Sequence, residues 1–120
     1  MKHGKKRRTL NRTKRQREAL LRDLARSLVL SNAITTTIAK AKELRPFVEE
    51  LVSAAKAGTV ASRRLVAARL HSPEAVKKLH DEYAKRFEKR SGGYTRIVRL
   101  GNVGRRVAEM ARIEFLAQEK

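Results

Sequence analysis

Residues 33–58 read AITTTIAKAKELRPFVEELVSAAKAG, and this stretch decides the fold. Ile34, Thr36 and Ile38 occupy alternate positions, and three consecutive threonines add further β-branched side chains. This pattern predicts a short strand over 33–38. Thr37 can then cap a helix, and the spacing of the apolar residues that follow predicts one that ends at Gly58. The apolar stripe consists of Ala41, Leu44, Val48, Leu51, Val52 and Ala55. A short strand therefore leads directly into a long amphipathic helix.

Further helix signals lie on both sides of this stretch. Upstream, Thr13 can cap a helix over about 13–30 in which leucines recur at helical spacing. Downstream, Thr59 can start a third helix, and Ser72, which precedes a proline and a glutamate, can start a fourth. Pro46 lies inside the central helix and is expected either to kink it or to mark its true start.

The C-terminal third contains one clear strand and one ambiguous segment. Residues 95–100 are rich in β-branched side chains, which predicts a strand. Residues 108–117 alternate like a strand, but their apolar side chains also line up at helical spacing, and the Ala, Glu and Met content favours a helix. The pattern alone leaves both alternatives open.

Charge gives the first indication of a partner. The 120 residues hold 30 Lys and Arg against 12 Asp and Glu, a formal net charge of +18, which favours a polyanion. The excess is concentrated, because residues 1–17 carry +9 and 85–112 carry +7, whereas 18–84 carry +3 and 113–120 carry −1. This distribution predicts a nearly balanced folded body with two basic segments. Five aromatic residues and no Trp favour recognition of a nucleic-acid backbone over base stacking.

Each basic segment has its own character. Residues 1–17, MKHGKKRRTLNRTKRQR, contain no acid, and residues 90–96, RSGGYTR, combine arginines with two glycines whose amides can approach a phosphate closely. Two other interpretations are a DNA-associated protein, and an organelle-targeted or membrane-surface amphipathic protein. No segment approaches the roughly 18 apolar residues of a membrane span.

Catalytic and metal-binding patterns are weak. The chain has no cysteine, which excludes a thiolate zinc site and a cysteine nucleophile. Glu49 and Glu50 are adjacent and should point to different helix faces, and His71 and His80 are far from the third histidine in the sequence. We therefore expect no enzymatic activity, no metal and no cofactor.

Three ordered blocks of the sequence form a recognisable pattern. They are Met1-Lys2-His3 with Arg8, Leu10, Asn11 and Arg12; Ile34-Thr35-Thr36-Thr37 with Lys40-Ala41-Lys42-Glu43-Leu44-Arg45; and Gly92-Gly93-Tyr94-Thr95-Arg96-Ile97. With these blocks, the chain resembles the bacterial large-subunit ribosomal protein seventeen family over essentially its whole length. The chain departs from the family pattern at Lys14, Arg15, Gln16 and Ala39, and at Gly104, Arg105 and Arg106.

The resemblance implies an α+β fold in which a helix, a strand, three helices and two strands build a small three-stranded mixed sheet packed on helices. It also implies a cytoplasmic protein that binds ribosomal RNA and supports large-subunit assembly near the peptide exit tunnel, beside neighbouring ribosomal proteins, with no membrane and no small-molecule substrate. Because Met110, Ile113 and Glu114 match the family's last strand, it favours a strand in the ambiguous segment.

On this basis we predict a basic RNA-binding arm over 1–12 and a single α+β domain over 13–120. The predicted RNA contacts comprise the basic start, the start of the central helix and the turn before the second strand. They are Lys2, His3, Lys5, Lys6, Arg7, Arg8, Asn11, Arg12, Lys14, Arg15, Arg17, Thr36, Lys40, Lys42, Arg45, Arg90, Gly92, Gly93, Tyr94, Thr95 and Arg96.

Overall fold

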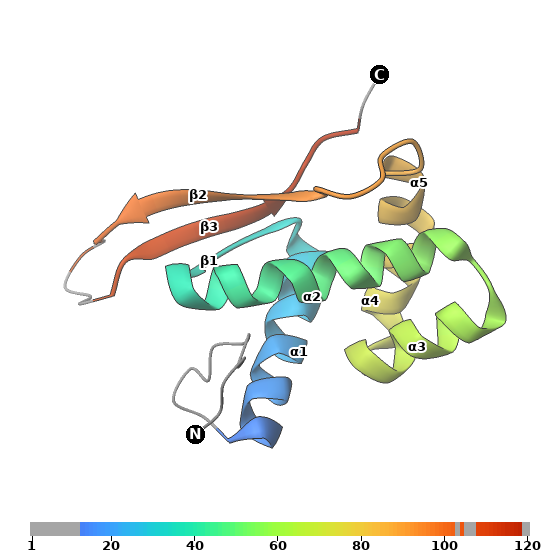
Figure 1. Ribbon diagram of the computed structural model, residues 1–120, viewed down its shortest axis with the longest axis horizontal. Coiled ribbons are helices and arrows are strands. Elements are labelled where there is room, and N and C mark those ends of the chain that lie inside the picture. The colour runs from blue at the N-terminus through green and yellow to red at the C-terminus, as the bar shows by residue number, and fades with distance from the viewer. Residues whose placement is uncertain (1–12, 103, 105–107, 119–120) are drawn as a thin grey trace, which may run out of the picture.

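A computed structural model of the chain describes residues 13–102, 104 and 108–118. The elements are α1 (Lys14–Ser31), β1 (Ala33–Thr37), α2 (Ile38–Ala57), α3 (Val60–Leu70), α4 (Pro73–Lys78), the π-helical turn η1 (Leu79–Tyr83), α5 (Ala84–Arg86), β2 (Thr95–Gly101) and β3 (Met110–Phe115) (Figure 1). Helix, strand, a helical region and two strands follow one another as predicted. The α+β fold class is therefore confirmed.

All four predicted helix caps are formed. In each case a side-chain hydroxyl accepts a hydrogen bond from the backbone N–H three residues later, at 3.1–3.3 Å, which satisfies a donor that the helix itself leaves unpaired. The capping residues are Thr13, Thr37, Thr59 and Ser72. Gly58 ends α2 with φ of +66°, a left-handed conformation that favours glycine. Pro46 lies inside α2 and does not mark its start, which the Thr37 cap sets.

The sheet has the strand order β1-β3-β2, and both neighbouring pairs are antiparallel. The prediction of a mixed sheet is wrong in this detail. The last strand of the chain lies in the middle, so β1 and β2, which run in the same direction, never become neighbours. The strand assignment for the ambiguous segment is confirmed, since Ile113 pairs with Ile34 on one side and Ile97 on the other. This central position overrides the helix propensity of the segment.

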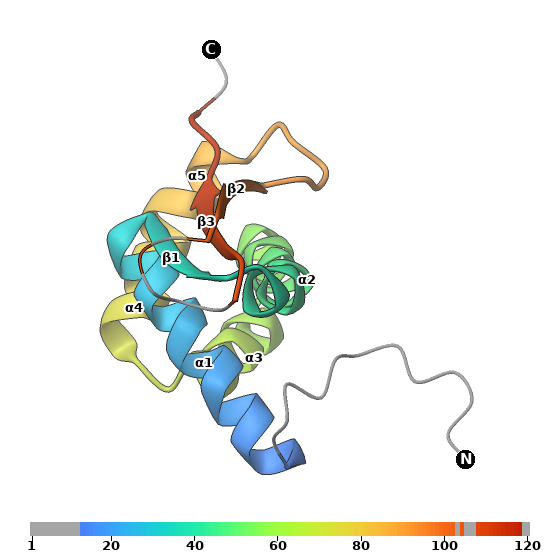
Figure 2. The same cartoon turned by 90° about the vertical axis from the view of Figure 1, so that its left-hand side faces the viewer.

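The core lies between one face of the sheet and the helices. Figure 2, which looks along the strands, shows α2 on one side of the sheet, and α2 contacts all three strands. On β3, Ile113 and Phe115 point into this core, where the Phe115 ring lies 4.1 Å from the ring of Tyr83, measured between centroids. Burial raises the pKa of Tyr83 to about 12, and its hydroxyl donates to the backbone oxygen of Val29 at 2.9 Å. The first turn of α3 does not contribute to this core, because Val60 is exposed.

Candidate nucleic-acid interface

The predicted contact residues that the structure describes lie in three separate regions. Figure 1 places the start of α1, the start of α2 and the turn between α5 and β2 in different parts of the molecule. We call them the α1 start (Lys14, Arg15 and Arg17), the α2 start (Lys40, Lys42 and Arg45) and the glycine turn (residues 90–96). The fold therefore does not gather the predicted contacts into one patch. Those within residues 1–12, and the loop arginines at 105 and 106, lie outside the described residues.

Two of these regions place cations at a helix N-terminus. The first turn of α1 contains Lys14 and Arg15, both exposed, and the first turn of α2 contains Lys40; neither first turn holds an acid. A positive charge there opposes the helix dipole, whereas a carboxylate would stabilise the helix by about 0.3–1 kcal/mol. By contrast, α4 has Glu74 in its first turn. Cations at the starts of α1 and α2, where the helix dipole favours negative charge, favour an anionic partner.

Arg45, which we predicted to grip phosphate, has a structural role in the fold. Its Nη2 donates to the backbone oxygen of Thr95 at 3.2 Å, and its Nε lies 3.5 Å from Glu49 Oε2. Glu49 Oε2 in turn accepts from the backbone N and the hydroxyl of Thr95, at 3.2 and 3.0 Å. Arg45 and Glu49 together fasten the beginning of β2 to α2. The Arg45 side chain is still 45% exposed, so it can also meet an anion from outside.

The glycine turn is shaped from within by a lysine that the sequence pattern did not indicate. Lys56 of α2 donates to the backbone oxygen of Arg90 and, at 3.1 Å, to the hydroxyl of Tyr94. Gly92 and Gly93 have φ of +133° and +62°, which L side chains rarely adopt. A Cβ added at Gly92 would meet nothing within 4 Å, so the backbone there faces open space. An outside group can approach this backbone closely.

Three predicted contact residues are buried in the interior. Tyr94 and Thr95 are 2% exposed and Thr36 is 7% exposed. Tyr94 packs against Phe87, with ring centroids 5.1 Å apart, and is not available to stack on a base. Thr36 belongs to the inward-pointing set of β1, and its neighbour Thr35 is the exposed one. The side chains of Thr36, Tyr94 and Thr95 therefore belong to the core and are not exposed to an outside partner.

The sheet carries one more exposed cation, Arg112 of β3, which the sequence pattern did not indicate. Glu114 on β3 accepts from Arg96 Nη2 of β2 and from Arg112 Nε of its own strand, each at 3.2 Å. Burial opposes ionisation of Glu114, but the hydrogen bonds and charges of the two arginines outweigh it and lower the pKa of this carboxyl. The alternation of apolar and charged residues along β3 could have indicated this cation. Neighbouring residues of a strand point to opposite faces of the sheet, so Arg112 points away from the face on which Ile113 is buried.

The low pKa of Glu114 predicts a pH effect on stability. Its carboxylate is favoured in the folded state, so it contributes stability above the ordinary pKa of 4.5 and loses it as the pH falls through the lower folded value. We expect the free energy of unfolding to fall more steeply below pH 4.5 in the unaltered chain than in Glu114→Gln. Urea titrations from pH 3 to 6 measure this difference. Parallel profiles for the two proteins would contradict it.

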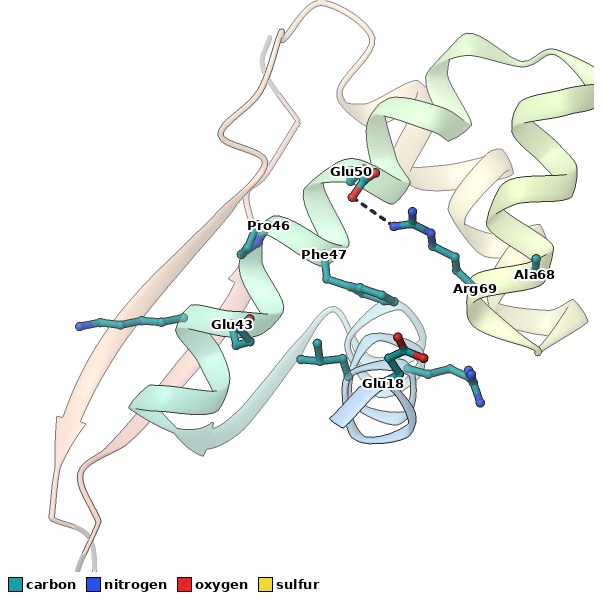
Figure 3. A pocket seen from close by; sticks show the side chains of 10 residues that line it. Glu18, Glu43, Pro46, Phe47, Glu50, Ala68 and Arg69 are labelled. Carbon is teal, nitrogen blue, oxygen red and sulfur yellow. Dashed lines mark hydrogen bonds and ion pairs between the residues drawn. The ribbon is translucent and has the colours of Figure 1, made fainter. Parts of the chain in front are cut away.

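A groove between α1, α2 and α3 differs from these basic regions. It has a volume of about 490 Å³, and Figure 3 shows Phe47 of α2 pointing into it toward α1. Arg69 Nη1 lies 3.1 Å from Glu50 Oε2, and its guanidinium lies over the Phe47 ring. Three acids and three bases line the groove, namely Glu18, Glu43, Glu50, Arg22, Lys42 and Arg69. This balanced lining does not favour a polyanion.

Within the described residues, no group of three or more His, Asp or Glu side chains could hold a metal ion. Glu49 and Glu50 point to different helix faces as predicted, toward Thr95 and Arg69. His71 ends α3 in a left-handed conformation, with φ of +52°. Burial and the nearby charge of Arg63 lower the pKa of His80.

Comparison with known proteins shows which family this chain belongs to. The family model described as ribosomal protein L17 matches residues 20–116. The chain belongs to the ribosomal protein L17 family. It is 53% identical to the large ribosomal subunit protein bL17 of Gemmatimonas aurantiaca, over 97% of this chain and 98% of that protein. It is 51% identical to the protein of the same name from Akkermansia muciniphila, over 97% and 85% of the two chains, and 50% identical to that of a Sulfurihydrogenibium species, over 97% of each.

Membership of the L17 family confirms the resemblance seen in the three sequence blocks. The match over residues 20–116 includes the α2 start, the glycine turn and all three strands. Proteins of the L17 family belong to the bacterial ribosome, which lies in the cytoplasm. None of the helices within the described residues has both the length and the apolar composition of a membrane span.

Proposed function

We propose that this chain is a structural constituent of the large ribosomal subunit that binds ribosomal RNA by neutralising phosphates with Lys and Arg side chains. In this role it supports subunit assembly near the peptide exit tunnel, beside neighbouring large-subunit proteins. The relatives carry the name of a large-subunit protein, which supports the assignment to that subunit. The position near the exit tunnel rests on family membership alone. The proposal needs no catalytic group, cofactor or small-molecule substrate.

The observation that carries RNA binding is the unfavourable placement of cations at the starts of α1 and α2. Lys14, Arg15 and Lys40 occupy first turns without an acid, a cost to the isolated fold that a phosphate partner would reverse. The glycine turn adds an open backbone at Gly92 in a third part of the molecule. Cations in several regions suit a protein that contacts several RNA segments at once, as a component embedded in a large RNA does.

The charge distribution also fits a role in assembly. Residues 18–84 carry only +3 and supply most of the helical core, so charge repulsion within the body is small. Residues 1–17 carry +9 and need a polyanion to offset their mutual repulsion. Binding therefore couples the basic segments to RNA while the body keeps its shape.

Salt dependence tests the electrostatic mechanism. If about eight phosphates are neutralised, the plot of log affinity against log salt should have a slope of about −6 to −7 for large-subunit RNA. Filter binding or fluorescence anisotropy between 50 and 400 mM KCl measures this slope. A slope near zero would refute phosphate neutralisation as the basis of binding.

Cofractionation tests the ribosomal assignment separately. We expect the chain in a bacterial extract to sediment with the large subunit at raised salt and to lose this position after ribonuclease treatment. Duplex DNA of equal length serves as the control ligand in the binding assay. Recovery only as free protein, or binding to duplex DNA that equals or exceeds binding to large-subunit RNA, would contradict the assignment.

A further inference from the structure

The face of the sheet that points away from α2 is a regular grid in which two arginines surround one carboxylate, beside short and apolar side chains. The strand register puts Arg96 of β2 and Ala33 of β1 on either side of Glu114, and Val98 and Thr35 on either side of Arg112. Thr35, Arg96, Val98 and Arg112 are exposed. Arg112 is accessible to solvent on this face, whereas the β3 side chains on the opposite face are buried against the helices.

Glu114 fixes the positions of two guanidinium groups on this grid. It uses one N–H donor of Arg96 and one of Arg112, and its own side chain is only 17% exposed. A guanidinium has five N–H donors, so each arginine keeps four for an outside partner. Their side chains are 62% and 51% exposed. The arrangement holds two planar guanidinium groups in place and leaves a net positive charge, as bidentate recognition of phosphate requires.

The neighbouring side chains indicate which part of a nucleic acid fits. Ala33 and Thr35 on β1 are short, so they leave room beside Arg112 for a bulky backbone, and the Thr35 hydroxyl can bond to a phosphate or a ribose 2′-hydroxyl. The side chains of this grid include no aromatic ring on which a base could stack. Charge and shape therefore favour a sugar-phosphate backbone.

We propose that this face of the sheet, centred on Arg112, is a further RNA-binding surface that takes a sugar-phosphate backbone of ribosomal RNA, with Arg96 and Arg112 as the phosphate ligands and Glu114 as the residue that positions them. The proposal rests on the proposed function and extends it to a face that the sequence pattern did not mark. Apart from Arg96, none of the contact residues predicted from the sequence belongs to it.

Substitution of Arg112 tests the contact by affinity. The loss of one phosphate contact corresponds to an affinity for RNA that is about five- to tenfold lower at 0.1 M salt. It also makes the slope of log affinity against log salt shallower by about one. We expect Arg112→Ala to show both changes with large-subunit RNA, and Arg112→Lys to restore the slope more fully than the affinity. The matched control is Arg64→Ala, which removes the same charge from an exposed position on α3, on the other side of α2 from the sheet. Equal effects of Arg112→Ala and Arg64→Ala would overturn the proposal.

A cysteine placed on the grid tests the identity of the partner. The chain has no cysteine, so Thr35→Cys provides a single thiol for a photoactivatable crosslinker in the full-length protein within reconstituted large subunits. We expect crosslinks to ribosomal RNA from position 35 and fewer from the control Leu65→Cys, which is exposed on α3. Crosslinks from position 35 to ribosomal protein only would overturn the proposal and identify the face as a protein interface.

These outcomes separate the two proposals. If Arg112→Ala binds as tightly as the unaltered chain while the unaltered chain binds ribosomal RNA with a steep salt slope, the sheet-face proposal fails and the proposed function stands. If the unaltered chain does not bind ribosomal RNA or enter the large subunit, the proposed function fails as well. Circular dichroism and the thermal midpoint of Arg112→Ala check that the fold is intact, which we expect because Arg96 still pairs with Glu114.

Discussion

Replacing Phe115 with alanine is expected to lower the free energy of unfolding by about 3–5 kcal/mol, because the change removes a large buried ring and leaves a cavity. Phe115 is 2% exposed at the end of the central strand, and its ring lies 4.1 Å from that of Tyr83 and 6.1 Å from that of Phe87. It therefore joins the sheet to the helical segment that runs from α4 to α5. Loss of the ring also removes aromatic contacts that add about 0.5–1.5 kcal/mol per pair.

The thermal midpoint should fall by roughly 10–20 °C, given a few degrees per kcal/mol for a domain of this size. Phe115→Leu is the matched control, since it keeps most of the buried volume and should cost clearly less. Differential scanning calorimetry measures both variants. A loss below about 1 kcal/mol for Phe115→Ala would show that the sheet and the helices do not share one cooperative core.

Most of the fold could be predicted from the sequence because its signals are local. Helix starts depend on a hydroxyl three residues before a backbone N–H, and the chain supplies one at each start, for example Thr37 and Ser72. The strand in residues 110–115 could not be read from local pattern, because pairing with two distant strands decides it. The wrong prediction of a mixed sheet has the same cause, since strand order depends on where the last strand inserts.

The candidate site was less predictable for the same physical reason. Density of charge marks Lys14, and the family resemblance of the central block marks Lys40, but the residues that shape the site act over long separations. Glu49 holds Thr95, 46 positions away, and Lys56 holds Tyr94, 38 positions away. Nothing in the local pattern indicates such partners. Residue type also misled in the opposite direction, since a threonine and a tyrosine in basic surroundings turned out to be core residues.

Neutralising four cations of the basic start should weaken binding to large-subunit RNA by at least about 100-fold at 0.1 M salt. Each phosphate contact contributes up to roughly tenfold under these conditions through counterion release. The variant replaces Lys5, Arg7, Arg8 and Arg12 with glutamine in the full-length chain, and the salt slope should become shallower by about 3 to 4. Helix content should not change, because α1 begins at Lys14 and is capped by Thr13.

A body variant with the same change in charge distinguishes specific contact from general attraction. Arg63, Arg64, Lys77 and Lys85 are exposed on the helical part of the molecule and can be replaced with glutamine together. If attraction depends only on net charge, both variants lose affinity equally, and the concentration of cations in the basic start has no specific role. If the basic start contacts phosphates directly, its variant loses much more affinity and slope than the body variant. We expect the second result, because long-range attraction between exposed charges is screened beyond about 10 Å at 0.1 M salt, whereas a contacted phosphate releases its counterions.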